Sequence, residues 1–399
     1  MSNPVVSQNP TPPPPTPDQV LGMTSDQFVE AFRGRFIVDG EGGKVGAMRA
    51  YHKLMRDGDT DVVAAGSVEI RRPEIGTVLR EPCLEGELVK FTQRVPGVAG
   101  KFGELATESV LIPMVGRSGS LTHTLCVSSQ IGCAMGCTFC ETAQMGLIRH
   151  LSAAEIVSQW WAATHVLGKR PSNVVFMGMG EPMDNLDNVL AAVAVLKDHH
   201  GPALPISKVT ISTVGRVDGI RRLGEKLHEP GWHRLNLAIS LNAPNDTVRD
   251  EIMPINRKYD LAELQKSLLA FPIYGGGKLC VEYVLIPGVN DRAEHAKEVA
   301  EFFEPINRHY QEDTRRGSVR AMINLIPYNP RRNSPWPAPT EESVDDFMRW
   351  LTERGIFTKR RRTKGRELMG ACGQLGSAEI RQRKLVDVSV GGEAQRALE

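Results

Sequence analysis

Three cysteines lie close together in the stretch IGCAMGCTFC, residues 131–140. Cys133, Cys137 and Cys140 have the spacing C-x3-C-x2-C, and no fourth cysteine follows them closely. A structural zinc site built from paired knuckles would need a second C-x2-C pair, and the sequence has only one. Three thiols on an iron–sulfur cluster leave one iron open, which is typical of a metal centre that handles a substrate. The triplet therefore favours a catalytic cluster, with a zinc site completed by a distant ligand as the alternative.

Short apolar runs and amphipathic segments alternate through the chain after this triplet. The runs stop at glycine, proline or a polar residue, as buried parallel strands do. They are SNVVFMGMGEP, KVTISTVG, LNLAISLNAP, LCVEYVLIPG and AMINLIPYNP. The helical segment that precedes the first run has Ser152 and Glu155 in capping-box spacing. With the strand that leads into Cys133, about six β/α units result. The sequence predicts an α/β fold: a partial parallel (β/α)6 barrel with a small N-terminal accessory domain.

Composition changes along the chain indicate where this barrel begins and ends. Residues 1–20 are proline-rich and predict a disordered lead-in. Residues 21–80 predict a small helical accessory domain, and residues 81–118 alternate enough to predict a β extension. We assign residues 119–366 to the barrel core and residues 367–399 to a C-terminal segment.

The overall composition is that of a soluble globular protein. Of 399 residues, 41% are hydrophobic and 24% are charged, and no stretch is long and apolar enough to span a bilayer. We therefore predict a cytoplasmic protein without a membrane partner, in which thiols stay reduced and clustered cysteines indicate metal binding or catalysis. The net charge of +1 neither favours nor excludes nucleic acid, although the run KRRRTKGR at 359–366 is basic.

Polar residues gather at the predicted carboxyl ends of the strands, where the loops of a parallel fold converge. GMGEP, residues 178–182, would allow close backbone approach to a polar ligand, and Glu181 could accept a hydrogen bond from an ammonium group. Ser212 and Asn242 could bind a carboxylate or a ribose. Taken singly, each is an ordinary loop residue. Several such ends at one crevice make a shared ligand site the better interpretation.

Residues 108–375 carry a set of longer motifs in collinear order. They are LCVSSQIGCAMGCTFCETAQMG, GMGEPMDN, VTISTVG, LAISLNAPND, RDEIMPINRKY, EYVLIPGVND, INLIPYNP and ACGQL. Together they resemble the RlmN/Cfr family of radical S-adenosylmethionine RNA methyltransferases. The resemblance implies a radical S-adenosylmethionine core with a [4Fe–4S] cluster on the three cysteines, and two molecules of S-adenosylmethionine consumed per turnover.

The same resemblance implies roles for further residues. Cys372 in ACGQL matches the family's methyl-carrying cysteine, and Cys126 in LCVSSQ matches the cysteine that resolves the protein–RNA adduct through a transient disulfide. Glu108 in ESVLIP falls where the family has its candidate general base. The positions that would contact S-adenosylmethionine are Gly180, Glu181, Ser212, Ser240, Leu241, Asn242 and Asn329.

The implied reaction is methylation of an adenosine ring carbon. The first S-adenosylmethionine methylates Cys372, and the second yields a 5′-deoxyadenosyl radical that takes hydrogen from the S-methyl group. The resulting carbon radical adds to adenine, with carbon 2 as the first choice, in 23S rRNA and possibly tRNA. A ring carbon that is not nucleophilic requires such a radical, and a thiolate is a suitable first methyl acceptor. The partners would be RNA and an electron donor such as flavodoxin or ferredoxin.

Two alternatives keep the fold but change the function. One is methylation of carbon 8, or radical chemistry on a different substrate. The other is a non-catalytic iron–sulfur or RNA-binding protein, which would have no use for the pair Cys126 and Cys372. The chain also departs from the family: Asn242 stands where many members have histidine, and residues 114–124 look inserted between Glu108 and Cys126.

Two features near the predicted barrel mouth could contact RNA. The basic run at 359–366 could hold phosphates, although a solvated basic face is the usual interpretation. Tyr328 and Trp336 could stack on a base, with core or lid packing as an equal alternative.

Overall fold

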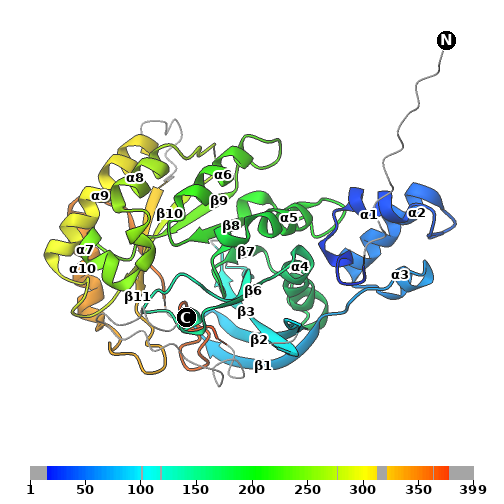
Figure 1. The fold of residues 1–399 in the computed structure, drawn as a ribbon, viewed down its shortest axis with the longest axis horizontal. Helices are drawn as coiled ribbons and strands as arrows, with labels where there is room; N and C mark the ends of the chain where they lie inside the picture. Colours follow the sequence, from blue (N-terminus) through cyan, green and yellow to red (C-terminus); the bar gives the residue numbers. More distant parts are fainter. Residues whose placement is uncertain are drawn as a thin grey trace, which may run out of the picture.

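The computed structural model describes residues 16–99, 102–116, 119–275, 277–311, 321–362 and 364–376. Residues 1–15 of the predicted lead-in lie outside the described residues. So do residues 377–399 of the predicted C-terminal segment. Ten strands form one sheet, in the order β1-β2-β3-β4-β7-β8-β9-β10-β11-β12 (Figure 1). Within the described ranges, no helix is long and apolar enough to cross a membrane.

Short helices precede the sheet and lie together at one end of the molecule (Figure 1). They are η1 (Val20–Gly22), α1 (Ser25–Phe32), α2 (Gly43–His52), the π-helical η2 (Lys53–Asp57) and α3 (Asp61–Ala65). Thr24 begins α1 with a capping box that includes Gln27, and Phe28 packs against Tyr51 of α2. The short η1 contacts helix α4 (Ala153–Trp161) of the barrel, so the helices are joined to the core.

Strands β1 (Glu74–Cys83), β2 (Gly86–Pro96) and β3 (Glu104–Val115) are antiparallel to one another. β3 pairs antiparallel with β4 (Leu121–Cys126), so these strands extend the barrel sheet and do not form a sheet of their own. β1 begins at Glu74, within the range 21–80 that was predicted to be helical. It is an edge strand with no buried side chain, so its sequence lacks the apolar alternation that reveals a half-buried strand.

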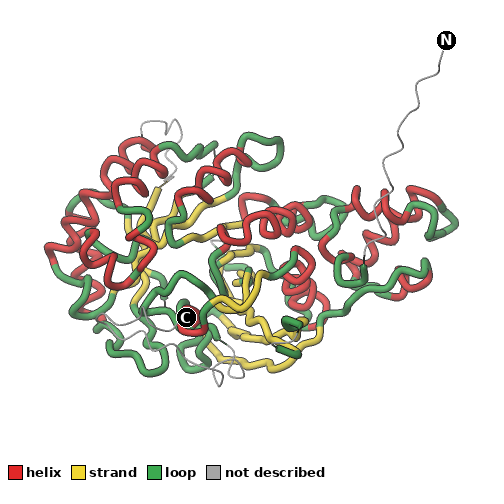
Figure 2. Tube along the Cα trace, in the orientation of Figure 1, coloured by secondary structure: helices red, strands yellow, loops and turns green. Residues whose placement is uncertain are grey.

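The predicted partial parallel (β/α)6 barrel is confirmed (Figure 2). Its parallel strands are β4, β7 (Asn173–Phe176), β8 (Val209–Thr213), β9 (Asn236–Ser240), β10 (Leu279–Leu285) and β11 (Ala321–Pro327). The helices that follow them are α4 (Ala153–Trp161), α5 (Leu186–Lys197), α6 (Val217–Leu227), α7 (Asp246–Ile252), α8 (Leu261–Leu269), α9 (Ala293–Gln311) and α10 (Glu341–Glu353). A seventh parallel strand, β12 (Thr358–Arg360), pairs with β11 and includes the start of the basic run.

Several short elements complete the loops. They are β5 (Gln130–Gly132), β6 (Leu147–His150), η3 (Thr142–Met145), η4 (Ala162–Val166), η5 (Pro182–Asn185), η6 (Ile206–Lys208) and η7 (Pro254–Arg257). β5 and β6 form a small antiparallel ladder whose connecting loop contains all three clustered cysteines. The loop is therefore closed at its base by backbone hydrogen bonds.

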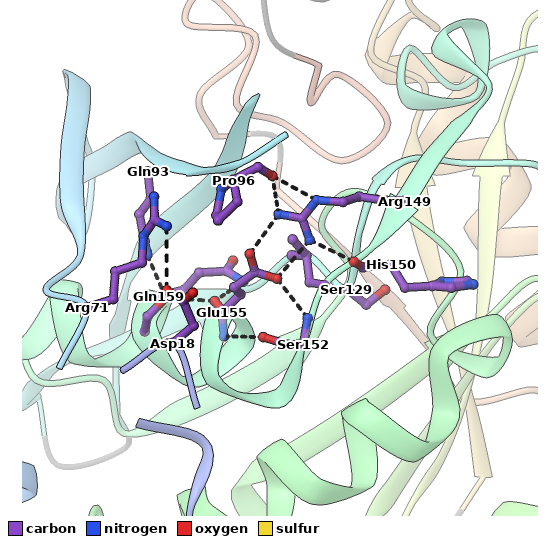
Figure 3. Close-up of polar contacts among 12 residues, drawn as sticks. Asp18, Arg71, Gln93, Pro96, Ser129, Arg149, His150, Ser152, Glu155 and Gln159 are labelled. Atoms are coloured by element: carbon purple, nitrogen blue, oxygen red, sulfur yellow. Dashed lines mark hydrogen bonds and ion pairs between the residues drawn. The ribbon is translucent and has the colours of Figure 1, made fainter. Parts of the chain in front are cut away.

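Arg149 of β6 fixes this ladder to the rest of the protein (Figure 3). Its guanidinium donates to the carbonyl oxygen of Pro96 at the end of β2 and forms a bidentate pair with Glu155 at 2.7 and 2.8 Å. Glu155 also accepts from the backbone N–H of Ser152 and so completes the predicted capping box of α4. One arginine thus joins the β extension, the cysteine loop and the first barrel helix.

Gly132 lies immediately before the first clustered cysteine in a conformation that favours glycine. Its φ is +74°, and a Cβ at this position would lie 1.8 Å from the carbonyl oxygen of Gly146. That same oxygen accepts a hydrogen bond from the backbone N–H of Cys133 at 2.9 Å. A side chain at Gly132 would therefore push apart the two strands that close the cysteine loop.

We expect Gly132→Ala to lose most of the iron that the wild-type protein retains, because the clash displaces Cys133. Iron and sulfide per chain, measured after anaerobic purification, check this expectation. Gly168→Ala is the matched control, because Gly168 has a φ of +65° but a Cβ added there would meet no atom within 4 Å. Equal iron content in the two variants would contradict the expectation.

Candidate functional site

One cavity lies at the carboxyl ends of the parallel strands, and most of the predicted site residues are on its wall. They are Cys133, Cys137, Cys140, Gly180, Glu181, Ser212, Ser240, Asn242, Asn329 and Cys372. Three predicted residues, Leu241, Cys126 and Glu108, are not on this wall. The fold therefore gathers side chains from the cysteine loop, from the strand ends and from the C-terminal segment around one space.

The three clustered thiols occupy a buried wall of this cavity. The side chains of Cys133 and Cys137 belong to residues only 8% and 5% exposed, and burial, followed by a neighbouring thiol, raises the pKa of each. Metal coordination would remove that cost, because a bound cation favours the thiolate. Among the described residues, no group of three or more His, Cys, Asp and Glu side chains has the geometry of a metal-ion site. The donor set itself, three cysteines at one cavity, fits a cysteine-ligated iron–sulfur cluster.

Glu181 is held rigidly beside these cysteines. Its two carboxylate oxygens accept from the backbone N–H groups of Met183 and Val214, both at 2.9 Å, and burial raises its pKa. Gly180 precedes it with a φ of +101°, and a Cβ there would lie 2.5 Å from the Cβ of Gln130. The GMGEP turn therefore requires glycine for close packing against the strand before the cysteine loop, and it fixes the carboxylate of Glu181 at the cavity.

The end of β9 is positioned by a buried cation that the sequence analysis did not identify. Arg249 of α7 is fully buried and donates to the carbonyl oxygens of Val214 at 2.6 Å and Leu241 at 3.2 Å. Its remaining nitrogen donates to Asn256 at 2.9 Å. Burial lowers the pKa of Arg249 to about 10. The arginine lies in the motif RDEIMPINRKY, but a sequence motif alone does not show which of its charges is buried.

Asn242 adopts a left-handed backbone conformation, with φ of +54°. Asparagine tolerates this region better than most residues. Its side-chain oxygen accepts from the backbone N–H of Val284 at 2.9 Å, and its amide nitrogen contacts the sulfur of Met253 at 3.5 Å. Asn242 thus links the end of β9 to β10. Among the described residues, the contact given for its amide N–H₂ group is to the sulfur of Met253, which is a weak acceptor.

Residues 364–376 reach back across the barrel to the cysteine loop. We call them the carrier segment, after the role that the family resemblance implies for Cys372. The backbone N–H of Glu141 donates to the carbonyl oxygen of Gly373 at 2.7 Å. The hydroxyl of Thr142 donates to the carbonyl oxygen of Leu375 at 2.6 Å. These bonds lie on the C-terminal side of Cys372 and hold its half-buried thiol at the cavity.

Cys126, at the end of β4, lies outside the main cavity, and its partner across β4 and β7, Val175, lines a second cavity that Cys372 also lines. Burial, with a smaller contribution from Cys372, raises its pKa to about 12, and Arg361 acts in the opposite direction. Both cysteines are free thiols. Cys372 shares this second cavity with Arg361, so it stands between two spaces.

Glu108 is buried on β3, behind the carrier segment. Its carboxylate forms an ion pair with Lys90 at 3.0 Å and accepts from the backbone N–H of Gly376 at 2.8 Å. Sequence reasoning did not identify Lys90, because one lysine in a strand is usually exposed. Glu108 therefore contacts the segment that carries Cys372.

The two features considered for RNA contact are largely occupied within the protein. Tyr328 is buried, its hydroxyl contacts Ser334, and its ring packs edge-on against Trp336. In the basic run, Arg360 pairs with Glu341 and Asp345, and Lys364 pairs with Glu85 at 3.0 Å. Packing within the protein therefore describes the buried Tyr328, whereas Trp336 is half-buried. Acidic neighbours pair with Arg360 and Lys364 of the basic run.

Comparisons with known proteins agree with this site. The Radical SAM superfamily matches residues 127–303, which include the cysteine loop and the ends of β7 to β10. The chain is 43% identical over 293 residues to the probable dual-specificity RNA methyltransferase RlmN 1 of Protochlamydia amoebophila, covering 72% of this chain and 76% of that protein. It is 34% identical over 390 residues to the dual-specificity RNA methyltransferase RlmN of Phenylobacterium zucineum, covering 92% and 93%.

A solved structure supports the same assignment. The crystal structure of a radical SAM methyltransferase from Sphaerobacter thermophilus superposes with a TM-score of 0.73 at 30% identity, covering 90% of this chain and 99% of that one. Similarity therefore extends over the accessory helices and the β extension as well as the barrel. Both the sequence matches and the fold place the cysteine loop in an enzyme family that uses S-adenosylmethionine and an iron–sulfur cluster. The chain belongs to the RlmN family of radical S-adenosylmethionine RNA methyltransferases.

Proposed function

We propose that this protein methylates carbon 2 of an adenosine in 23S rRNA, and also in tRNA, with Cys372 as the intermediate methyl carrier. The observation that supports it most directly is the position of Cys372 on the wall of the cavity that also holds the cysteine triplet and Glu181. A non-catalytic iron–sulfur or RNA-binding protein would need the cluster or an RNA-binding surface, but it would not need a fourth thiol, Cys372, on the wall of the same cavity. The relatives named as dual-specificity RNA methyltransferases supply the substrate class.

Each group of residues has a separate task in this proposal. Cys133, Cys137 and Cys140 would hold a [4Fe–4S] cluster, and Glu181 would accept from the ammonium group of S-adenosylmethionine. When bound, these cofactors supply the methyl group and the radical that a non-nucleophilic ring carbon requires. Gly180, Ser212, Ser240, Leu241, Asn242 and Asn329 would line the S-adenosylmethionine site. A small electron-transfer protein such as flavodoxin or ferredoxin would supply the electrons.

Cys126 would release the product. Carbon 2 of the radical adduct must first lose its hydrogen as a proton and its unpaired electron to the electron-transfer protein. The Cys126 thiolate would then attack the sulfur of Cys372, forming a disulfide as the carbon–sulfur bond breaks. The electron pair of that bond passes to the methylene carbon, which takes a proton and becomes the methyl group of the product. The position of the two cysteines supports this role, since Val175, which pairs with Cys126 across β4 and β7, lines the same second cavity as Cys372.

Comparison of RNA from cells with and without this protein identifies the product. We expect loss of 2-methyladenosine from both 23S rRNA and tRNA when the gene is deleted, and its return on complementation with the wild type but not with Cys372→Ala. Nucleoside mass spectrometry after digestion of each purified RNA makes the measurement. Loss of 8-methyladenosine would replace carbon 2 with carbon 8, and an unchanged RNA would exclude RNA as the substrate.

Replacing Cys126 by Ala should trap the reaction before release. RNA is then expected to stay covalently attached to Cys372, because no thiolate can break the carbon–sulfur bond. A denaturing gel followed by nuclease digestion and peptide mass spectrometry would locate the adduct. Cys280→Ala is the control, because it removes another mostly buried thiol. Free, fully methylated RNA from Cys126→Ala would contradict the resolving role.

Release should also depend on pH through Cys126. Because burial raises its pKa to about 12, the reactive thiolate is the minor form at neutral pH and its fraction rises about tenfold per pH unit. Single-turnover release from the preformed adduct should therefore accelerate from pH 7 to pH 9 without reaching a plateau. A release rate that is constant over this range would show that deprotonation of Cys126 does not limit it.

A further inference from the structure

The ion pair between Lys90 and Glu108 is enclosed between the β extension and the carrier segment. Their side chains are 7% and 4% exposed, and the Nζ–Oε2 distance is 3.0 Å. Thr92 pairs with Glu108 across β2 and β3, so Lys90 is a diagonal neighbour on the same face of the sheet. Two charges removed from water in this way are costly unless each also has further hydrogen-bond partners.

Those further partners all lie in the carrier segment. The ammonium group of Lys90 donates to the carbonyl oxygens of Met369 at 2.9 Å and Leu368 at 3.4 Å. The carboxylate of Glu108 accepts from the backbone N–H of Gly376 at 2.8 Å. The pair therefore forms hydrogen bonds to the segment both before Cys372 in the sequence and after it.

We propose that Lys90 is a positioning residue for Cys372: with Glu108 it clamps the carrier segment from both sides and so holds the carrier thiol at the cysteine cavity. This inference deepens the proposed function and rests on it, because it assumes that Cys372 carries the methyl group. The clamp works through backbone groups of the segment, so its action requires no contact between Lys90 and any substrate.

The cysteine loop alone holds only one side of the carrier thiol. Its hydrogen bonds to Gly373 and Leu375 lie after Cys372, and Gln374 adds a bond to the carbonyl oxygen of Pro330 at 2.9 Å. Before Cys372, the hydrogen bonds from Lys90 to Leu368 and Met369 attach the segment to strand β2 of the β extension. Farther from Cys372, Lys364 and Gly365 also bond to the β extension, at Pro113 and Glu81. Without Lys90, the segment would keep these bonds and its attachment to the cysteine loop, but lose the support at Leu368 and Met369, close to Cys372 in the sequence.

The clamp uses one oxygen of the Glu108 carboxylate. Lys90 and the backbone N–H of Gly376 both contact Oε2. The positioning role proposed for Lys90 is therefore separate from any acid–base role of Glu108, and a variant that removes Lys90 leaves the carboxylate present.

The test compares Lys90→Met and Lys90→Arg in the full-length protein, purified anaerobically with its cluster. Peptide mass spectrometry gives the methylated fraction of Cys372, and hydrogen exchange gives the protection of the peptide that contains Gly376. We expect Lys90→Met to lower the methylated fraction at least fivefold. Exchange at Gly376 should speed up at least tenfold, because Glu108 loses the ammonium group that holds its Oε2 beside the N–H of Gly376. Lys90→Arg should recover most of both, because arginine keeps the charge and the donors.

A second readout distinguishes positioning from general damage to the fold. Lys90→Met should raise the amount of 5′-deoxyadenosine released per methylated nucleoside at least threefold, because a misplaced S-methyl group fails to intercept the radical. Arg94→Met is the matched control: Arg94 pairs with Glu104 across the same two strands at 3.3 Å, but both side chains are about half exposed. This variant should leave all three readouts within twofold of wild type.

The outcomes separate the two proposals. If wild-type Cys372 carries no methyl group, the carrier function is wrong, while exchange at Gly376 still reports whether the clamp exists. If wild-type Cys372 is methylated and Lys90→Met leaves methylation, exchange and the product ratio unchanged, the clamp is wrong. Should Lys90→Met fail to fold because Glu108 is left unpaired, the double variant Lys90→Met with Glu108→Gln removes both charges, and the same three readouts decide.

Discussion

The docking of the carrier segment across the open side of the barrel is the constraint on which the site depends. Cys372 follows the last strand, β12, so contacts outside the strand ladder must bring its thiol to the clustered cysteines. Two surfaces do so together: the cysteine loop, through Glu141 and Thr142, and the β extension, through Lys90 and Glu108. The β extension therefore has a clear structural purpose, since it continues the sheet on the side where the parallel strands stop.

Buried polar groups recur wherever the fold must fix a loop at the cavity. Arg249 joins the ends of β8 and β9, Arg149 joins β6 to β2 and α4, and Glu181 holds the turn after β7. Each group has partners for its charge or its lone pairs, which is the condition for burying it. The apolar core stabilises the barrel, and these few buried charged groups hold the loops of the site in place.

Much of the barrel could be predicted from the sequence, because buried parallel strands produce apolar runs that end at glycine or polar residues. The edge strands could not. β1 has no buried side chain, and β12 lies in a basic run in which Arg360 pairs with Glu341 and Asp345 of α10. The cavity residues at the strand ends could be predicted, because the carboxyl ends of parallel strands meet at one edge of the sheet. Lys90 and Arg249 could not be predicted, because their burial depends on segments distant in sequence. Cys126 and Cys372 were identified through family resemblance, since spacing alone cannot show that they meet.

One labelling measurement tests the central claim, that Cys372 delivers the methyl group. Cys372 is first loaded with a trideuterated methyl group, unbound S-adenosylmethionine is removed, and a single turnover on RNA is started with unlabelled S-adenosylmethionine. Our account predicts that the methyladenosine formed carries two deuterium atoms, because one is removed from the S-methyl group before the carbon joins adenine. An unlabelled methyl group in that first product would show direct transfer from S-adenosylmethionine and would contradict the account.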